Sequence, residues 1–227
     1  MELDDGRLTE EGLPPAGAGR LRVIACGALA REVLALKAAS GWDGVSLQCL
    51  PAKLHNRPER IPDAVRGAIR AARAEGYDRL FVLYADCGTG GALDRLCAEE
   101  GVERIAGPHC YSFFEGNAVF AARADAGEID AFYLTDFLAR QFDALVWRGM
   151  GLDRHPELLP IYFGHYRRLV YLAQTEDPAL EAKARAAAER LGLSYERRFT
   201  GLGGLADALR PHLTDRGAGL ADRGSPS

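Results

Sequence analysis

The chain lacks any long hydrophobic run. None of its apolar stretches approaches the roughly 20 residues that a membrane-spanning helix needs, and its acidic start at residues 1–5 has no apolar signal core. It also lacks a basic stretch that would offset its 32 acidic residues, and its formal net charge is -4. These absences argue against a membrane protein and against a dedicated nucleic-acid binder, and they predict a cytoplasmic location.

Several catalytic and binding motifs are missing as well. The sequence contains no G-x-G-x-x-G fingerprint, no Walker pattern, no Gly-x-Ser-x-Gly and no His-Glu-x-x-His. Its five cysteines never show the CxxC spacing typical of zinc sites. An odd number of cysteines in a chain of 227 residues suits free thiols or metal ligands better than a disulfide framework.

What the sequence does contain is an alternation of strand and helix patterns. Short hydrophobic runs that end in turn residues predict strands near residues 21–25, 45–50, 80–84, 102–105 and 131–134. Helical patterns separate these runs, which predicts an α/β fold with a mainly parallel, Rossmann-like sheet flanked by helices. Two helices, at about 158–174 and 178–191, then form a helical insertion before a last strand at 194–199.

These patterns predict one folded domain. Residues 20–213 are expected to form a single α/β domain that includes the helical insertion at about 150–192. Residues 1–19 are polar and rich in Gly and Pro, so they are expected to be a flexible lead-in, and residues 214–227 are expected to be a flexible tail.

Three cysteines stand where predicted strands end. Cys26, Cys87 and Cys110 follow three different strands, and the carboxyl ends of parallel strands share one edge of a sheet. We therefore expect these thiols to converge. With His109 they would form a soft ligand set suited to zinc or to an iron–sulfur cluster. A nucleophilic or redox-active thiol, and three unrelated buried cysteines, remain alternatives.

The turn that follows Cys87 is rich in glycine. The amides of Gly88, Thr89 and Gly90 stand at the start of a predicted helix, where they are candidates for binding a phosphate or carboxylate group of a cofactor. This turn also underlies an alternative prediction, in which the protein is a small-anion-binding module.

Three further polar residues are candidates for catalytic groups. His55 lies in a polar loop at the same predicted edge, although loop histidines are usually just solvated. Glu115 follows two phenylalanines, so it is a candidate for a desolvated acid or base. His165 lies on the apolar face of the predicted helix 158–174, where a core histidine is more common than a ligand.

The segments Ile24-Ala25-Cys26, Leu54-His55-Asn56-Arg57-Pro58, Asp86-Cys87-Gly88-Thr89-Gly90 and His109-Cys110 together resemble an uncharacterised prokaryotic family. This family is known as domain of unknown function 1638, and the resemblance extends from about residue 21 to residue 204. Two further segments, at 133–136 and 151–156, are also similar to it.

The resemblance implies no established activity. The family's genes often stand near those for corrinoid proteins and trimethylamine-methyltransferase-like enzymes, which implies a place in one-carbon metabolism.

The leading expectation is therefore a metal-dependent enzyme, namely a methyltransferase in corrinoid-linked methyl transfer to a small-molecule substrate. A zinc ion held by three thiolates would bind a thiol substrate at its open fourth position. An iron–sulfur cluster is the alternative cofactor. A non-enzymatic accessory protein that binds a corrinoid protein or carries metal is the alternative function.

Overall fold

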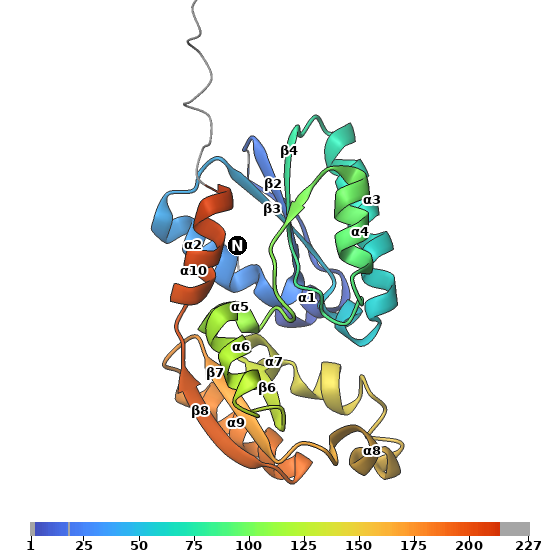
Figure 1. Ribbon diagram of the computed structural model, residues 1–227, viewed down its shortest axis with the longest axis vertical. Helices are drawn as coiled ribbons and strands as arrows, with labels where there is room; N and C mark the ends of the chain where they lie inside the picture. The colour runs from blue at the N-terminus through green and yellow to red at the C-terminus, as the bar shows by residue number, and fades with distance from the viewer. Residues whose placement is uncertain (1–2, 18, 214–227) are drawn as a thin grey trace, which may run out of the picture.

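The computed structural model describes residues 3–17 and 19–213 and contains two separate β-sheets (Figure 1). The larger sheet has the strand order β1-β3-β2-β4-β5. Its strands are β1 (Leu13–Ala16), β2 (Leu21–Cys26), β3 (Val45–Leu50), β4 (Arg79–Leu83) and β5 (Glu103–Arg104). All neighbouring pairs are parallel except β1 and β3. The mainly parallel α/β class is therefore confirmed.

The smaller sheet has the order β6-β7-β8 and is entirely parallel. Its strands are β6 (Ala131–Thr135), β7 (Arg168–Ala173) and β8 (Ser194–Phe199). The expected strand at 131–134 belongs to this sheet, so the prediction of one continuous sheet is wrong. Strand propensity is local and does not reveal which neighbour a strand pairs with.

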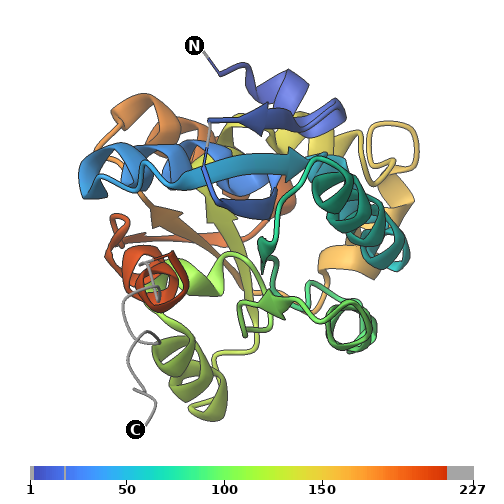
Figure 2. The ribbon, with the colours of Figure 1, turned by 90° about the horizontal axis from the view of Figure 1, so that it is seen from above.

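Helices cover both sheets. They are α1 (Asp5–Glu10), α2 (Ala30–Ser40), α3 (Ile61–Ala74), α4 (Ala92–Glu100), α5 (Ser112–Glu115), α6 (Asn117–Asp125), α7 (Asp136–Arg140), α8 (Leu159–Phe163), α9 (Pro178–Leu191) and α10 (Gly203–Leu213). Helices α2, α3, α4 and α10 contribute to the core of the larger sheet, whereas α7 and α9 pack in the core of the smaller one. Figure 2 shows α10 on the opposite side of the molecule from α3 and α4. We call the larger sheet with its helices the first lobe and the smaller sheet with its helices the second lobe. The chain thus returns to the first lobe after it completes the second.

Short helical turns connect these elements. Single turns of 3-10 helix are η1 (Gly27–Leu29), η2 (Ala52–Asn56), η3 (Pro58–Arg60) and η5 (Pro156–Leu158), and a π-helical turn, η4, spans Asp143–Trp147. Turns η1 and η2 follow the carboxyl ends of β2 and β3, so they stand at the edge of the sheet where we expected a site.

The described part of residues 1–19 is ordered, which corrects the prediction of a flexible lead-in. Helix α1 begins after Asp4, whose side chain accepts a hydrogen bond from the Arg7 amide, and Leu8 is only 2% exposed. Strand β1 contains Pro14 and Pro15, which lack the amide protons that a central strand needs. This edge strand therefore pairs on one side only. The predicted tail at 214–227 lies outside the described residues.

The expected helix at 158–174 is also wrong. The structure has the short helix α8 followed by the strand β7, which is the central strand of the smaller sheet. Five of the six residues of β7 are buried, because helices and loops cover both faces. A strand buried on both faces is a continuous apolar run, which periodicity alone does not distinguish from a buried helix.

The second helix of the expected insertion is confirmed as α9. Asp177 caps it by accepting hydrogen bonds from the amides of Ala179 and Leu180, and Pro178 occupies its first position. Gly192 ends it in the left-handed conformation. In the part of the chain that the structure describes, no helix has the length and apolar character needed to cross a membrane.

Glu32 on α2 yields a prediction about stability. Its side chain is 5% exposed, one carboxylate oxygen has no hydrogen-bond partner among the described residues, and burial raises the pKa to about 7. Because the folded-state pKa exceeds the ordinary value near 4.5, the stabilising contribution is present below about pH 4.5 and is lost as the pH rises to about 7. At pH 8 we expect the free energy of unfolding of Glu32→Gln to exceed that of the wild type by up to about 3 kcal/mol. The variant should therefore unfold at a higher urea concentration.

The control for this prediction is Glu59→Gln, which changes an exposed glutamate on η3. Urea unfolding at pH 4.5 and pH 8 measures the free energy of unfolding for all three proteins. Equal pH dependence in the wild type and in Glu32→Gln would contradict the burial of an ionisable Glu32.

Candidate functional site

The order of the strands defines a switch point between β2 and β4. From β2 the chain crosses to β3 on one side, and β4 and β5 then lie on the other. In open α/β sheets ligands bind in the crevice at the carboxyl ends of the strands beside such a point. Cys26 is the last residue of β2, and Cys87 lies in the loop after β4. Two of the predicted thiols therefore flank the switch point.

The three thiols converge on one small cavity of about 40 Å³. It lies inside the junction of the larger sheet, the turns η1 and η2, and the start of α7. Its lining includes the polar residues Cys26, Cys87, Cys110, His55, His109, Tyr84, Tyr111 and Thr135. The expected convergence of the cysteines is therefore seen in the structure. The other two cysteines lie elsewhere, since Cys97 is buried in α4 and Cys49 is buried in β3.

The loops after β4 and β5 lie side by side, and two backbone hydrogen bonds join them. The amide of Asp86 donates to the Gly107 carbonyl, and the amide of Cys87 donates to the Pro108 carbonyl, both at 2.9 Å. This pairing accompanies a short distance of 3.3 Å between the sulfurs of Cys87 and Cys110. Both thiols are free, and their separation exceeds the S–S bond length of about 2.05 Å.

Cys87 has an unusual backbone. Its φ is +48°, and among the described residues it is the one non-glycine residue with a positive φ. A side chain in this left-handed region costs free energy, and such residues cluster at functional sites. The positive φ therefore makes Cys87 a candidate for a functional residue.

The three thiols differ in the direction in which the protein shifts their pKa. The hydrogen bond from Cys110 lowers the pKa of Cys87, and this effect outweighs burial. The same hydrogen bond, together with burial, raises the pKa of Cys110. Burial raises the pKa of Cys26 to about 12. In metal-free protein Cys87 is therefore the first of the three to become a thiolate.

Tyr84 is a residue that the sequence did not single out. It directly follows β4 within a run of buried residues, is 1% exposed and lines the cavity. Its hydroxyl lowers the pKa of the Cys26 thiol, yet no group in the described chain makes a hydrogen bond of normal geometry to its oxygen. A buried hydroxyl without a partner is costly. The only advance signal was a tyrosine at the end of a buried strand.

Two histidines stand between this cavity and a larger one. His55, on η2, remains accessible to the larger cavity, and the surrounding protein lowers its pKa by displacing water. His109 is half-buried and stacks on Tyr111, with ring centroids 4.8 Å apart. Burial, and then the proximity of His55, lower the pKa of His109. Both imidazoles therefore favour the neutral form, which can bind a metal or accept a proton.

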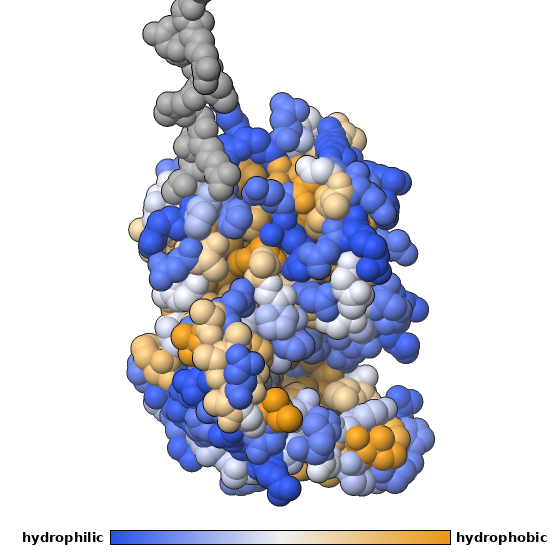
Figure 3. Space-filling view, viewed as in Figure 1, coloured by the Kyte–Doolittle hydropathy of each residue, from blue (hydrophilic) through white to orange (hydrophobic). Residues whose placement is uncertain are grey.

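The larger cavity is a cleft of about 610 Å³ between the two lobes. Figure 3 shows the surface hollowed where the lobes meet. His55, His109 and Tyr111 line both the cleft and the cysteine cavity, so the two spaces adjoin. Six aromatic side chains contribute to the cleft wall: Tyr111, Phe132, Tyr133, Tyr162, Phe163 and Tyr166.

The side chains around the cysteine cavity do not have the spacing of a complete metal site. Within residues 3–17 and 19–213, no three His, Cys, Asp or Glu side chains form a group that could hold a metal ion. Cys87 and Cys110 lie within the separation of about 4 Å that two sulfurs on one metal allow. What is missing is a third ligand at comparable distance. The expected ligand set of Cys26, Cys87, Cys110 and His109 shares one cavity without having ligand spacing.

The glycine-rich turn after β4 binds a carboxylate of the chain itself. Asp86 Oδ1 accepts hydrogen bonds from the Gly91 amide and the Thr89 hydroxyl, both at 2.8 Å, and Oδ2 accepts one from the Gly90 amide at 3.2 Å. Burial opposes ionisation, but these hydrogen bonds outweigh it and lower the pKa of Asp86. At the turn where we expected Gly88, Thr89 and Gly90 to bind a cofactor, the Thr89 hydroxyl and the Gly90 amide are thus already bonded to Asp86.

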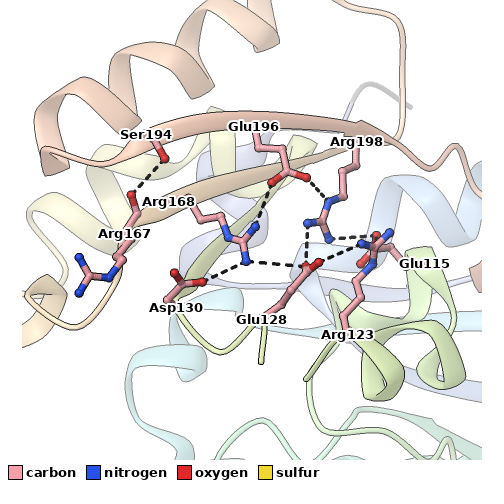
Figure 4. A network of polar contacts seen from close by, with 9 residues as sticks. All are labelled: Glu115, Arg123, Glu128, Asp130, Arg167, Arg168, Ser194, Glu196 and Arg198. Carbon is pink, nitrogen blue, oxygen red and sulfur yellow. Dashed lines mark hydrogen bonds and ion pairs between the residues drawn. The ribbon is translucent and has the colours of Figure 1, made fainter. Parts of the chain in front are cut away.

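Glu115, which we predicted to be a catalytic group, lies outside both cavities. One of its oxygens is 3.4 Å from Arg123 Nε and 3.5 Å from Arg198 Nη1. Figure 4 shows that this carboxylate belongs to a network of ion pairs that joins α5 and α6 to β7 and β8. The Glu115 side chain is thus buried, as its position after two phenylalanines suggested, and its contacts are with arginines.

His165 also falls outside both cavities. It lies in the turn between α8 and β7 rather than on a helix, and its side chain is exposed. Its ring packs on Tyr166 with centroids 3.9 Å apart. The assignment of His165 to a catalytic role depended on the helix at 158–174, which does not form.

Selective alkylation tests the order of thiol reactivity. We expect iodoacetamide at pH 7.5 to modify Cys87 of metal-free protein at least about tenfold faster than Cys26, Cys49 or Cys97, because Cys87 is partly exposed and its pKa is lowered. Peptide mass spectrometry measures the rates.

The Cys110→Ala variant should slow this reaction, because it removes the hydrogen bond that favours the Cys87 thiolate. Cys97→Ala is the matched control and should leave the rate unchanged. Faster modification of any other cysteine would contradict this order.

Comparison with known proteins identifies the family. The chain belongs to the family described as protein of unknown function (DUF1638), whose model matches residues 49–209. The match begins within β3 and ends within α10, so it includes Cys87, Cys110, His55 and His109 but not Cys26. Neither the curated proteins nor the solved structures contain a significant match.

Proposed function

We propose that this member of the DUF1638 family is a zinc-dependent enzyme. In this proposal Cys26, Cys87 and Cys110 hold the metal, and the adjoining cleft brings a small-molecule substrate to it. The observation that carries the proposal is that three thiols from separate strand ends line one cavity together with two histidines.

The chemistry of the donor set fits zinc. Thiolates and imidazoles are the ligands that zinc prefers, and two sulfurs on a tetrahedral zinc lie about 3.8 Å apart when each bond is about 2.3 Å. The observed 3.3 Å between Cys87 and Cys110 is closer to that value than to a disulfide bond. Cys26 and His109 line the same cavity and are the candidates for the third ligand. The unpartnered Tyr84 hydroxyl beside Cys26 fits a thiolate acceptor there.

The strand order supports a Rossmann-like assignment for the larger sheet. Numbered along the chain from β2, its parallel strands β3-β2-β4-β5 have the order 2-1-3-4, which is that of the flavodoxin-like class of doubly wound sheets. In such sheets the ligand lies beside the first strand, here β2. The proposed metal position and the proposed fold family therefore agree.

The reaction that we propose is methyl transfer to a thiol substrate, with a corrinoid protein as the methyl donor. Zinc would supply the capacity to hold the substrate sulfur as a thiolate. His55 stands at the boundary of the two cavities, where its neutral imidazole can accept the thiol proton. The aromatic wall excludes water and orients the substrate.

Metal content tests the proposal. Protein purified without oxygen should contain about one zinc per chain, measured by elemental analysis and an absorption spectrum. We expect Cys87→Ala and Cys110→Ala to bind zinc more than about 100-fold more weakly, since even groups that only support a ligand change the affinity by about 10–100-fold. Iron with sulfide and a brown colour would instead assign an iron–sulfur cluster.

Cys97→Ala is the control, because Cys97 is a buried cysteine outside the cavity. It should retain zinc in full. If the wild type binds neither zinc nor iron, or if the triple variant at Cys26, Cys87 and Cys110 binds metal like the wild type, the metal centre is disproved.

Tyr84 provides an independent prediction. The Tyr84→Phe variant should bind zinc about 10–100-fold more weakly, because the hydroxyl no longer donates a hydrogen bond to the Cys26 thiolate. Its thermal stability without metal should not fall, because the lost hydroxyl had no partner among the described residues. Cobalt substitution reports the sulfur ligands through their absorption bands. An unchanged spectrum and affinity would show that Tyr84 has no role at the metal.

A further inference from the structure

The cleft between the lobes carries charge of one sign. Although the chain has 32 acidic residues, no aspartate or glutamate is among the described residues that line the cleft or the cysteine cavity. Arg57 is the one arginine or lysine in that lining. Arg57 is therefore the one side chain in the described lining that carries a fixed charge.

Arg57 is held at the cleft while its guanidinium stays unpaired. The neighbouring Asn56 donates a hydrogen bond from Nδ2 to the Leu145 carbonyl at 2.7 Å, which ties this loop to the opposite side of the cleft. Within the described chain, the Arg57 side chain has neither an ion pair nor a hydrogen bond. By contrast, Arg104 and Arg198 each contact a carboxylate. Arg57 is therefore available to a ligand.

The aromatic side chains form two groups. In one group His109, Tyr111 and Tyr133 stack in sequence, with centroids 4.8 Å and 5.1 Å apart and ring planes within 19° of parallel. In the other, Phe132 meets Phe163 edge to face at 5.1 Å. Because these rings pack against each other, they form firm apolar walls. The volume of about 610 Å³ lies in the range for a drug-sized ligand.

We propose that the ligand of this cleft is an organic acid with a flat, apolar body and a thiol at its far end. The acid group pairs with Arg57, the body lies between the two aromatic groups, and the sulfur reaches the cysteine cavity past His55 and His109. The thiol end rests on the proposed zinc function, whereas recognition of the acid does not. Cationic amines are disfavoured, because no carboxylate in the described lining would balance their charge.

The acid is tested first, with metal-free protein and three matched probes. These probes are 2-naphthoate, the neutral 2-naphthamide and the cationic 2-naphthylmethylamine, and calorimetry measures their affinities. We expect the acid to bind at least about tenfold more tightly than the amide, and the amine to bind least tightly. Arg57→Gln should abolish the preference for the acid. Arg60→Gln, an exposed arginine outside the lining, should retain it.

The thiol end is tested next, with the zinc-loaded protein and 6-mercapto-2-naphthoate. The added thiol should increase affinity at least about tenfold with zinc present, and not after chelation or in Cys87→Ala. If the acid shows no preference, or if Arg57→Gln leaves the preference intact, the inference is overturned whatever the metal content. If the acid preference holds but the thiol adds nothing, the thiol end and the zinc function fail while acid recognition stands.

Discussion

The hydrogen bonds made by Asp86 are the constraint on which the site depends. Its carboxylate satisfies two backbone amides and a hydroxyl of the following turn, and its own amide pairs with the loop after β5. The chain can therefore reverse direction immediately after a buried strand without leaving buried polar groups unpaired. This tight turn holds Cys87 in a left-handed conformation, and it places the Cys87 sulfur beside Cys110. Without it, the two thiols would belong to independent loops.

The second lobe turns a thiol cavity into a site with a substrate space. A single sheet would leave the carboxyl ends of its strands open to water. Here the smaller sheet, with α7, η4 and α8, stands opposite that edge, and the cleft forms where the lobes meet. The junction is secured by the return of α10 to the first lobe, by the Asn56 hydrogen bond to Leu145, and by the ion pairs around Glu115 and Arg198. The position of the thiols and the shape of the cleft are thus separate contributions of the two lobes.

Part of this arrangement could be predicted from residues alone. Strand ends, helix caps and turns are local features, so the placement of Cys26, Cys87 and Cys110 after strands, and the capping of α9 by Asp177, follow from short stretches of sequence. The strand β7 could not be predicted in this way. It is buried on both faces, so its apolar run carries no period of two, and the expected helix placed His165 where it does not lie.

The sequence by itself determined the α/β class, the mainly parallel pairing and the presence of cysteines at the ends of strands, because each of these follows from local propensity and burial pattern. The tertiary structure alone decided that the strands divide into two sheets and that Asp86 occupies the turn expected to bind an anion. It also decided that Glu115 forms ion pairs with arginines, and that Tyr84 and Arg57 line the cavities. These outcomes depend on which groups distant in the chain come into contact. Such contacts are set by strand pairing and by the need to satisfy every buried polar group, and no local pattern encodes them.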